Sequence, residues 1–122
     1  MKRFRVITAV LFILLPPLGA SAQSNDIDRR LEEASALIRE NRVAEAEQRL
    51  NSILKVAPRE ARSLNLLGVI RASQGRLDEA ETYFARAIRL DNLLVGAHMN
   101  LAYLYMLKGA PERTVSQLKV VL

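Results

Sequence analysis

Residues 64–90 read LNLLGVIRASQGRLDEAETYFARAIRL, and this stretch contains two helix-period patterns separated by one breaker. In its first half Leu64, Leu67 and Gly68 recur at spacings of three and four residues, which places apolar or very small groups along one helical face. Gly75 then tolerates the left-handed conformation that ends a helix. We therefore expect a helix, a tight turn and a second helix.

The second half of the stretch carries a matching apolar face. Asp78 and Glu79 put negative charge at the positive end of a new helix. Apolar residues then recur at helical spacing at Leu77, Ala80, Phe84, Ala87 and Ile88. Ala80 is small enough to let two antiparallel helices approach closely around Phe84. Arg71 is the one charged member of the first stripe, and neither helix can bury its stripe alone.

The same pattern returns on both sides of this hairpin. The shift along the chain that superimposes Ala46 on Ala80 also superimposes Leu50 on Phe84, Ile53 on Ala87, Leu67 on Leu101, Gly68 on Ala102 and Gly75 on Gly109. A fixed period that keeps small and large positions in place indicates a repeat array.

The chain resembles the tetratricopeptide repeat family. The residues that carry the resemblance are Leu67, Gly68, Gly75, Ala80, Phe84 and Ala87, with Pro58 closing the preceding unit. The resemblance implies an all-α solenoid of about three antiparallel helical hairpins, with repeats at about 27–60, 61–94 and 95–122, the last incomplete. The sequence departs from the family pattern where Arg30, Leu64 and His98 replace an early aromatic residue, where Thr114 replaces the second-helix alanine, and where Asn92 stands in the place of Pro58.

Local signals set the expected helix ends. We expect the first helix to begin near Ile27, capped by Asn25 or Asp26. The chain should turn at 41–42, and the next helix should end before Pro58, because proline disfavours helix at the residue before it. In the third hairpin we expect a turn at 109–110, a restart at Pro111, and a buried stripe continued by Leu118 and Val121.

The N-terminus has the three parts of a secretory signal peptide. Residues 1–5 are cationic, 6–15 form an apolar run interrupted by Thr8, and the small residues 20–22 precede Gln23. An uncleaved membrane anchor is the alternative, but the apolar run is too short to cross about 30 Å of hydrocarbon comfortably. We therefore predict a leader at 1–22 that is removed, a repeat domain at 23–122 without a membrane span, and export to a bacterial periplasm or, alternatively, secretion.

The charge of the chain does not favour nucleic acid as a partner. The 18 basic and 13 acidic residues give a net charge of +5, but Lys2, Arg3 and Arg5 lie in the predicted leader. Without them 15 basic residues remain against 13 acidic ones, and these alternate along the helices. Such alternation is typical of solvated helix faces, whereas a phosphate-binding surface would be a basic stripe.

Nothing in the composition favours catalysis. The 122 residues include no cysteine and one histidine, which excludes disulfides and cysteine-ligated metal sites, and no glycine-rich phosphate loop is present. His98 occupies the place of Leu64, so we interpret it as a packing residue. The acidic pairs at helix starts are explained by the helix dipole. We predict a non-catalytic protein without a cofactor or metal.

The resemblance also implies a binding surface. In the family the first helices of successive hairpins line a concave groove that receives a segment of a protein partner. On this sequence that surface comprises Arg62, Asn65, Val69, Met99, Asn100, Tyr103 and Met106. Tyrosine and methionine suit an apolar partner, and asparagine amides can bond an extended backbone. The alternative is that these residues pack between repeats.

The C-terminal residues look unlike the polar cap that usually ends a repeat array. Val120, Val121 and Leu122 are all apolar. Either the sequence is part of a longer array, which we favour, or its apolar end packs on a partner or on a second copy as a homo-oligomer. The sequence thus leaves two functions open, a scaffold that binds a partner segment and a self-assembling structural protein.

Overall fold

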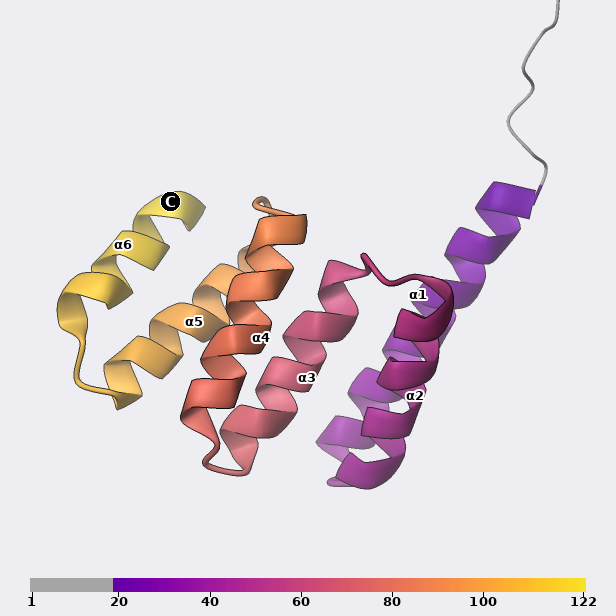
Figure 1. Ribbon diagram of the computed structural model, residues 1–122, viewed down its shortest axis with the longest axis horizontal. Helices are drawn as coiled ribbons and strands as arrows, with labels where there is room; N and C mark the ends of the chain where they lie inside the picture. Colours follow the sequence, from indigo (N-terminus) through magenta and orange to yellow (C-terminus); the bar gives the residue numbers. More distant parts are fainter. Residues whose placement is uncertain (1–18) are drawn as a thin grey trace, which may run out of the picture.

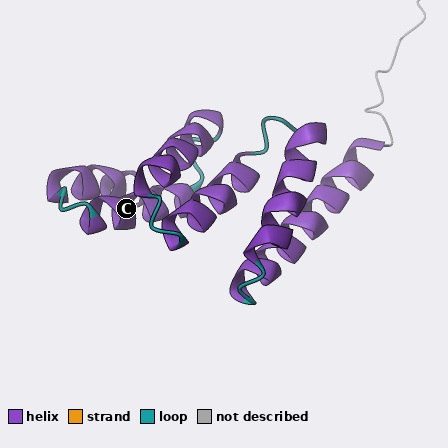
Figure 2. Ribbon diagram, turned by 60° about the horizontal axis from the view of Figure 1, so that its bottom comes forward, coloured by secondary structure: helices purple, strands orange, loops and turns teal. Residues whose placement is uncertain are grey.

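A computed structural model describes residues 19–122, all of whose regular elements are α-helices (Figures 1 and 2). The helices are α1 (Gly19–Arg39), α2 (Val43–Val56), α3 (Ala61–Ser73), α4 (Leu77–Leu90), α5 (Val95–Leu107) and α6 (Pro111–Val121). They form three antiparallel hairpins, α1–α2, α3–α4 and α5–α6, that follow one another along the molecule (Figure 1). The predicted all-α solenoid is confirmed.

The three hairpin turns share one backbone device. Asn41, Gly75 and Gly109 have φ angles of 59°, 74° and 69°, and they are evenly spaced along the chain. In the second and third turns glycine adopts this left-handed conformation without the steric cost of a Cβ, and asparagine is among the few other residues that tolerate it. The period read from the sequence is therefore also the period of the turns.

The start of the first helix was predicted wrongly. We expected it near Ile27 with Asn25 or Asp26 as cap, but α1 already includes Gly19. Within the helix Asp26 instead forms ion pairs with Arg29 at 2.6 Å and Arg30 at 2.8 Å. Ion pairs between residues three and four positions apart are favoured inside a helix, so Asp26 lies within α1 and does not cap it. The predicted leader at 1–22 lies mostly outside the described residues.

The core runs between neighbouring hairpins. Phe84 of α4 is 1% exposed and packs with Ala80, Leu101 and Leu104. Its ring occupies the space that Gly68 leaves open, since a Cβ on Gly68 would lie 2.5 Å from Phe84 Cε1. The predicted close approach around Phe84 is thus correct, and Gly68 makes it possible.

In the third hairpin the burial is less complete than expected. Thr114 is buried, but Leu118 and Val121, which we placed in the buried stripe, are only half-buried. Among the described residues no helix follows α6, so α6 packs on α5 alone, whereas α4 packs on both α3 and α5. The apolar stripe of α6 is therefore present, but only its side toward α5 is covered.

Candidate functional site

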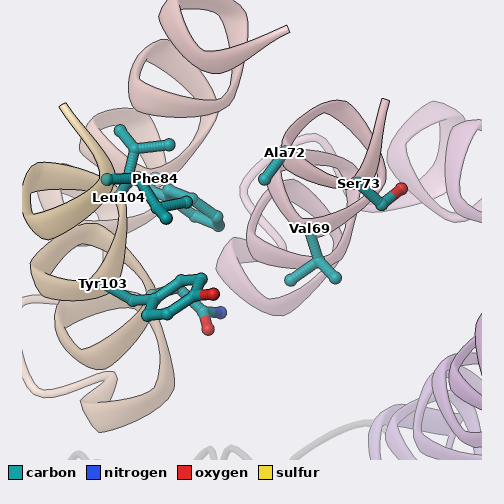
Figure 3. A pocket seen from close by; sticks show the side chains of 8 residues that line it. Val69, Ala72, Ser73, Phe84, Tyr103 and Leu104 are labelled. Carbon is teal, nitrogen blue, oxygen red and sulfur yellow. The ribbon is translucent and has the colours of Figure 1, made fainter. Parts of the chain in front are cut away.

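A hollow of about 380 Å³ lies between α3 and α5, the first helices of the second and third hairpins (Figure 3). It is lined by Val69, Ala72, Ser73, Phe84, Asn100, Tyr103, Leu104 and Leu107. None of these side chains is charged. The hollow therefore offers an apolar surface with a few neutral hydrogen-bonding groups.

The floor of the hollow is rigid and apolar. Phe84 and Leu104, each 1% exposed, form it, and both face α3 across the gap in Figure 3. The opposite wall is built from small side chains, Ala72 and Ser73, which leave the space open. Ser73 donates its hydroxyl to the carbonyl of Ile70 at 2.7 Å and so remains folded against its own helix.

The rim carries exposed apolar groups on α5. Tyr103 is 60% exposed and Leu107 53%, while Val69 on α3 is half-buried. Large apolar side chains exposed beside a hollow are typical of surfaces that bind a partner. Tyr103 combines rigid apolar area with a hydroxyl that can exchange hydrogen bonds.

The two predicted asparagines meet in the structure. Asn100 Nδ2 donates to Asn65 Oδ1 at 3.0 Å, and both side chains are half-buried. This bond uses one donor of Asn100 and the acceptor oxygen of Asn65. The carbonyl oxygen of Asn100 still has acceptor capacity for a backbone N–H at the edge of the hollow.

Arg62 is separate from the hollow. Its guanidinium lies 2.8 Å from Glu60 and 2.7 Å from Asp28, and Glu60 and Arg62 line a second hollow of about 340 Å³ between α1 and α3. The hydrogen bond to Glu60 raises the pKa of Arg62, and the same bond lowers the pKa of Glu60. Because Glu60 and Asp28 already balance the positive charge of Arg62, little of that charge is available to attract a partner.

Of the seven predicted residues the hollow therefore collects three, Val69, Asn100 and Tyr103. Met99 and Met106 lie on α5 with exposures of 49% and 62%, outside its lining. The sequence analysis placed Phe84 in the core only, and it missed Ala72, Ser73, Leu104 and Leu107, because small residues and ordinary helix-packing leucines give no signal of a site. Whether any of the seven contacts a partner stays a prediction.

His98 lies in the core of the third hairpin. It is 4% exposed, with Nε2 at 2.9 Å from the Asn92 carbonyl and Nδ1 at 2.9 Å from Gln117 Oε1. The side chain thus ties the start of α5 both to the preceding loop and to α6. This position agrees with the packing role that we inferred from its correspondence to Leu64.

The described part of the chain contains neither a cluster of metal ligands nor a membrane-spanning helix. Residues 19–122 contain no group of three or more histidine, cysteine or acidic side chains placed to hold a metal ion. None of the six helices is long and apolar enough to cross a membrane.

The profile of the family described as "Tetratricopeptide repeat" matches residues 31–93. The chain belongs to the tetratricopeptide repeat family. Repeats of this family are in general non-catalytic modules that bind proteins or peptides. A search of curated proteins found no match to this sequence.

Several solved structures share the fold of this chain. An O-GlcNAc transferase mutant of Thermobaculum terrenum is 28% identical with a TM-score of 0.72, over 80% of this chain and 19% of its own. The second repeat domain of Spaghetti (RPAP3), solved with the HSP90 peptide SRMEEVD, is 16% identical with a TM-score of 0.69, over 83% of this chain and 95% of its own.

A third solved structure, MamA residues 41 to the end from Desulfovibrio magneticus, is 20% identical. Its TM-score is 0.67, over 83% of this chain and 58% of its own. The repeat array described here thus spans about a fifth of the transferase chain and somewhat over half of the MamA chain.

Proposed function

We propose that this tetratricopeptide repeat protein is an exported, non-catalytic scaffold that binds a segment of a protein partner in the hollow between α3 and α5. The observation that carries the proposal is the exposure of Tyr103 and Leu107 beside an apolar floor of Phe84 and Leu104. Burying these exposed side chains against a partner contributes about 25 cal/mol for each Å² of apolar surface removed from water.

The lining of the hollow favours an apolar partner segment. An uncharged lining binds an apolar side chain well, but it offers no cation for a carboxylate. The related RPAP3 domain was solved with a peptide that ends in E-E-V-D. For the present chain we propose a different specificity, in which an apolar side chain enters the hollow and the backbone of the segment bonds to Asn100.

Photo-crosslinking in the native cell tests this proposal. A probe at Tyr103 should give a specific adduct with another protein, and a probe at the exposed Arg86 of α4 is the control. Identification of the adduct would name the partner. Identical adducts from both positions would contradict the choice of binding face, and adducts only with the same chain would favour self-assembly instead.

A matched pair of variants then tests the chemistry of the hollow. Val69→Asp and Tyr103→Asp place a carboxylate at the apolar rim, so we expect each to weaken binding of the crosslinked partner at least about tenfold, a change of about 1.4 kcal/mol. Arg86→Asp changes the charge elsewhere and should leave binding unchanged. Circular dichroism must show the same helicity in all three variants. Equal binding by wild type and Tyr103→Asp would refute the proposed site.

The location of the protein is part of the proposal. The leader pattern at 1–22 supports export, with the bacterial periplasm as the first choice and secretion as the alternative. Cleavage after residue 22 would leave Ile27 and Leu31, the α1 residues that pack into the core, in the mature chain. Fractionation of cells with N-terminal sequencing should find a chain that starts at Gln23 outside the cytoplasm. An uncleaved cytoplasmic chain would refute export.

A further inference from the structure

A second hollow, of about 310 Å³, lies where α3 begins and α4 ends, at the opposite end of α3 from the hollow between α3 and α5 (Figure 1). Two elements build it, the loop before α3 and the last part of α4. We call it the arginine hollow, because three of its five lining residues are arginines: Pro58, Arg59, Arg86, Arg89 and Leu90.

The three arginines of this hollow differ from the others in their partners. Every other arginine of residues 19–122 lies within 4.0 Å of a carboxylate oxygen. Arg59, Arg86 and Arg89 form no such pair with any described residue, and all three are exposed. The arginines without an ion pair in the described part of the chain therefore all line one opening. A cleft lined by charge of one sign attracts ions of the opposite sign.

The acidic groups near the arginine hollow are engaged elsewhere. Glu60, next to Arg59 in the chain, pairs with Arg62 at 2.8 Å. Asp91, which follows α4, accepts a backbone N–H of the next loop at 3.0 Å. Two further carboxylates line an adjoining hollow with Arg89, and one lysine binds both at 2.7 Å: Asp78 and Glu81, with Lys108. The positive charge of the hollow is thus not balanced by its surroundings.

Contacts within α4 explain the arginines only in part. Arg89 lies in the last turn, where a cation interacts favourably with the helix dipole. The guanidinium of Arg86 lies 5.9 Å from the centroid of the Tyr83 ring, which is a cation–π contact. Neither the dipole nor the ring carries a net charge, and neither accounts for Arg59 on the other side of the opening.

The repeat framework does not need arginine at these positions. A shift by one repeat places Arg59 on Leu93 and Arg86 on Val120, which are 81% and 57% exposed. The opposite shift places the three arginines on residues of which one is basic: Asn25, Ser52 and Lys55. Since the hairpins pack in the same way without them, the three arginines are an addition to this one junction, and a ligand accounts for them better than packing does.

We propose that the arginine hollow binds a phosphate monoester. At neutral pH such a group carries a charge of about −1.5 to −2 and three strong acceptor oxygens. Guanidinium groups bond phosphate oxygens in a planar fork, so three arginines match the charge and the acceptors of one phosphate. A single carboxylate would balance only one of them. Pro58 and Leu90 offer apolar contact to the organic group that carries the phosphate.

The form of the hollow favours a single phosphate group over a nucleic acid. Binding a nucleic-acid backbone requires a basic stripe that follows many phosphates, and the other arginines of the described residues are paired with carboxylates. A phosphate monoester occurs both in soluble metabolites and in lipid headgroups. The chemistry that the arginines recognise is the same in both.

A titration of the purified full chain with glycerol 3-phosphate, followed by NMR of the arginine Nε–H groups, tests the site. The signals of Arg59, Arg86 and Arg89 should shift together and give one dissociation constant, whereas glycerol, which lacks the phosphate, should shift none of them. Arg49, an exposed arginine that pairs with Glu33 at 3.3 Å, gives the control signal. No shift of the three signals, or an equal shift of Arg49, would overturn the proposal.

Variants measure the contribution of each arginine. Arg59→Gln, Arg86→Gln and Arg89→Gln should each weaken binding of glycerol 3-phosphate about fivefold, while Arg49→Gln, which removes the same charge from α2, should not. Arg59→Lys keeps the charge but loses the fork, so it should restore only part of the affinity. Circular dichroism must show unchanged helicity. An Arg49→Gln variant as weak as the other three would contradict a defined site.

Vesicles distinguish the two sources of the phosphate. Co-sedimentation compares phosphatidylcholine vesicles with vesicles that also contain phosphatidic acid, whose headgroup is a phosphate monoester. Recruitment that requires phosphatidic acid and is abolished by Arg59→Gln/Arg86→Gln would assign the site to a lipid headgroup. Binding of glycerol 3-phosphate without recruitment would assign it to a soluble ester. Recruitment that the double variant retains, without binding of glycerol 3-phosphate, would overturn the proposal.

The arginine hollow and the hollow between α3 and α5 can be tested independently. Val69→Asp and Tyr103→Asp change only the latter, so they should leave binding of glycerol 3-phosphate unchanged. Loss of phosphate binding in these two variants would contradict a separate site at the arginine hollow.

Discussion

The second and third hairpins solve the same packing problem with different side chains. In the second, Gly68 of α3 makes room for Phe84 of α4, while at the equivalent places the third has Ala102 and Leu118, and the first has Ala34 and Leu50. The difference indicates that a larger side chain on the second helix goes with a smaller residue on the first. Of these six residues only Phe84, whose ring lies over Gly68, lines the hollow between α3 and α5.

Gly68→Ala is the variant that should have the largest effect on this pair of residues. The new Cβ would meet the Phe84 ring at 2.5 Å, so the buried ring must shift. We expect a loss of about 3 kcal/mol in the free energy of unfolding, measured by urea denaturation. The double variant Gly68→Ala/Phe84→Leu, which copies the pair of the third hairpin, should recover much of the loss. Additive effects of the two changes would contradict the volume exchange.

The polar contacts between hairpins give a second comparison. Arg71 is 11% exposed in its side chain and donates to Glu47, with Nη1–Oε2 at 3.2 Å, whereas Tyr105 donates to Glu81 at the equivalent place. We expect Arg71→Ala to cost about 2 kcal/mol by urea denaturation, because Glu47 is left half-buried without its partner. Arg71→Tyr, which borrows the residue of the third hairpin, should cost clearly less. If Arg71→Ala and Arg71→Tyr lowered the free energy of unfolding equally, the two contacts would not be equivalent.

The Arg71 pair also predicts a pH dependence. The hydrogen bond from Arg71 lowers the pKa of Glu47 below 4.5 in the folded state. A lowered pKa contributes stability that is present above the unfolded value and is lost as the pH falls through the folded value. Denaturation between pH 6 and 3 should therefore show a shallower acid decline for Arg71→Ala than for wild type. Parallel profiles would show that Glu47 is not the group responsible.

The turns allow a smaller test. Gly75 has a φ of +74°, so Gly75→Ala should cost about 1 kcal/mol through backbone strain. Asn41 has the same conformation in the first turn. Asn41→Gly should therefore change the free energy of unfolding by only a few tenths of about 1 kcal/mol. Thermal unfolding of the two variants measures both effects. A neutral Gly75→Ala would mean that the turn can adopt another conformation at no cost.

The smallest expected change is a gain. Ser63 is fully buried, and its hydroxyl has no hydrogen-bond partner among the described residues, whereas the third hairpin has Ala97 there. Ser63→Ala should stabilise the protein by about 0.5 kcal/mol, because it removes an unsatisfied buried hydroxyl. Urea denaturation should show a higher midpoint with an unchanged slope. A loss of stability would indicate that the hydroxyl is bonded in solution.

Most of the fold could be predicted because its signals are local and repeated. Gly75, Gly109 and Pro58 mark helix ends within a few residues, and one constant shift aligns the core positions of the hairpins. The start of α1 could not be predicted, because residues 19–26 lack the apolar period that identified the other helices.

The lining of the hollow was predicted less well, since it depends on contacts between residues far apart in the chain. Arg62 was assigned to the partner surface, yet it pairs with Asp28, which occupies the equivalent position one repeat earlier. The repeat register itself could have revealed this pair. The lining by Ala72 and Ser73 could not be found in the same way, because it results from the absence of larger side chains.

The common spacing of the three turns has a consequence for how such a protein can change in evolution. Asn41, Gly75 and Gly109 mark equivalent points, and the polar contacts Arg71–Glu47 and Tyr105–Glu81 both span 24 residues. A duplication of the gene segment between two of these points would add one whole hairpin and recreate the junction contacts on each side of it. The length of the array can therefore grow by a single genetic event without redesign of its core.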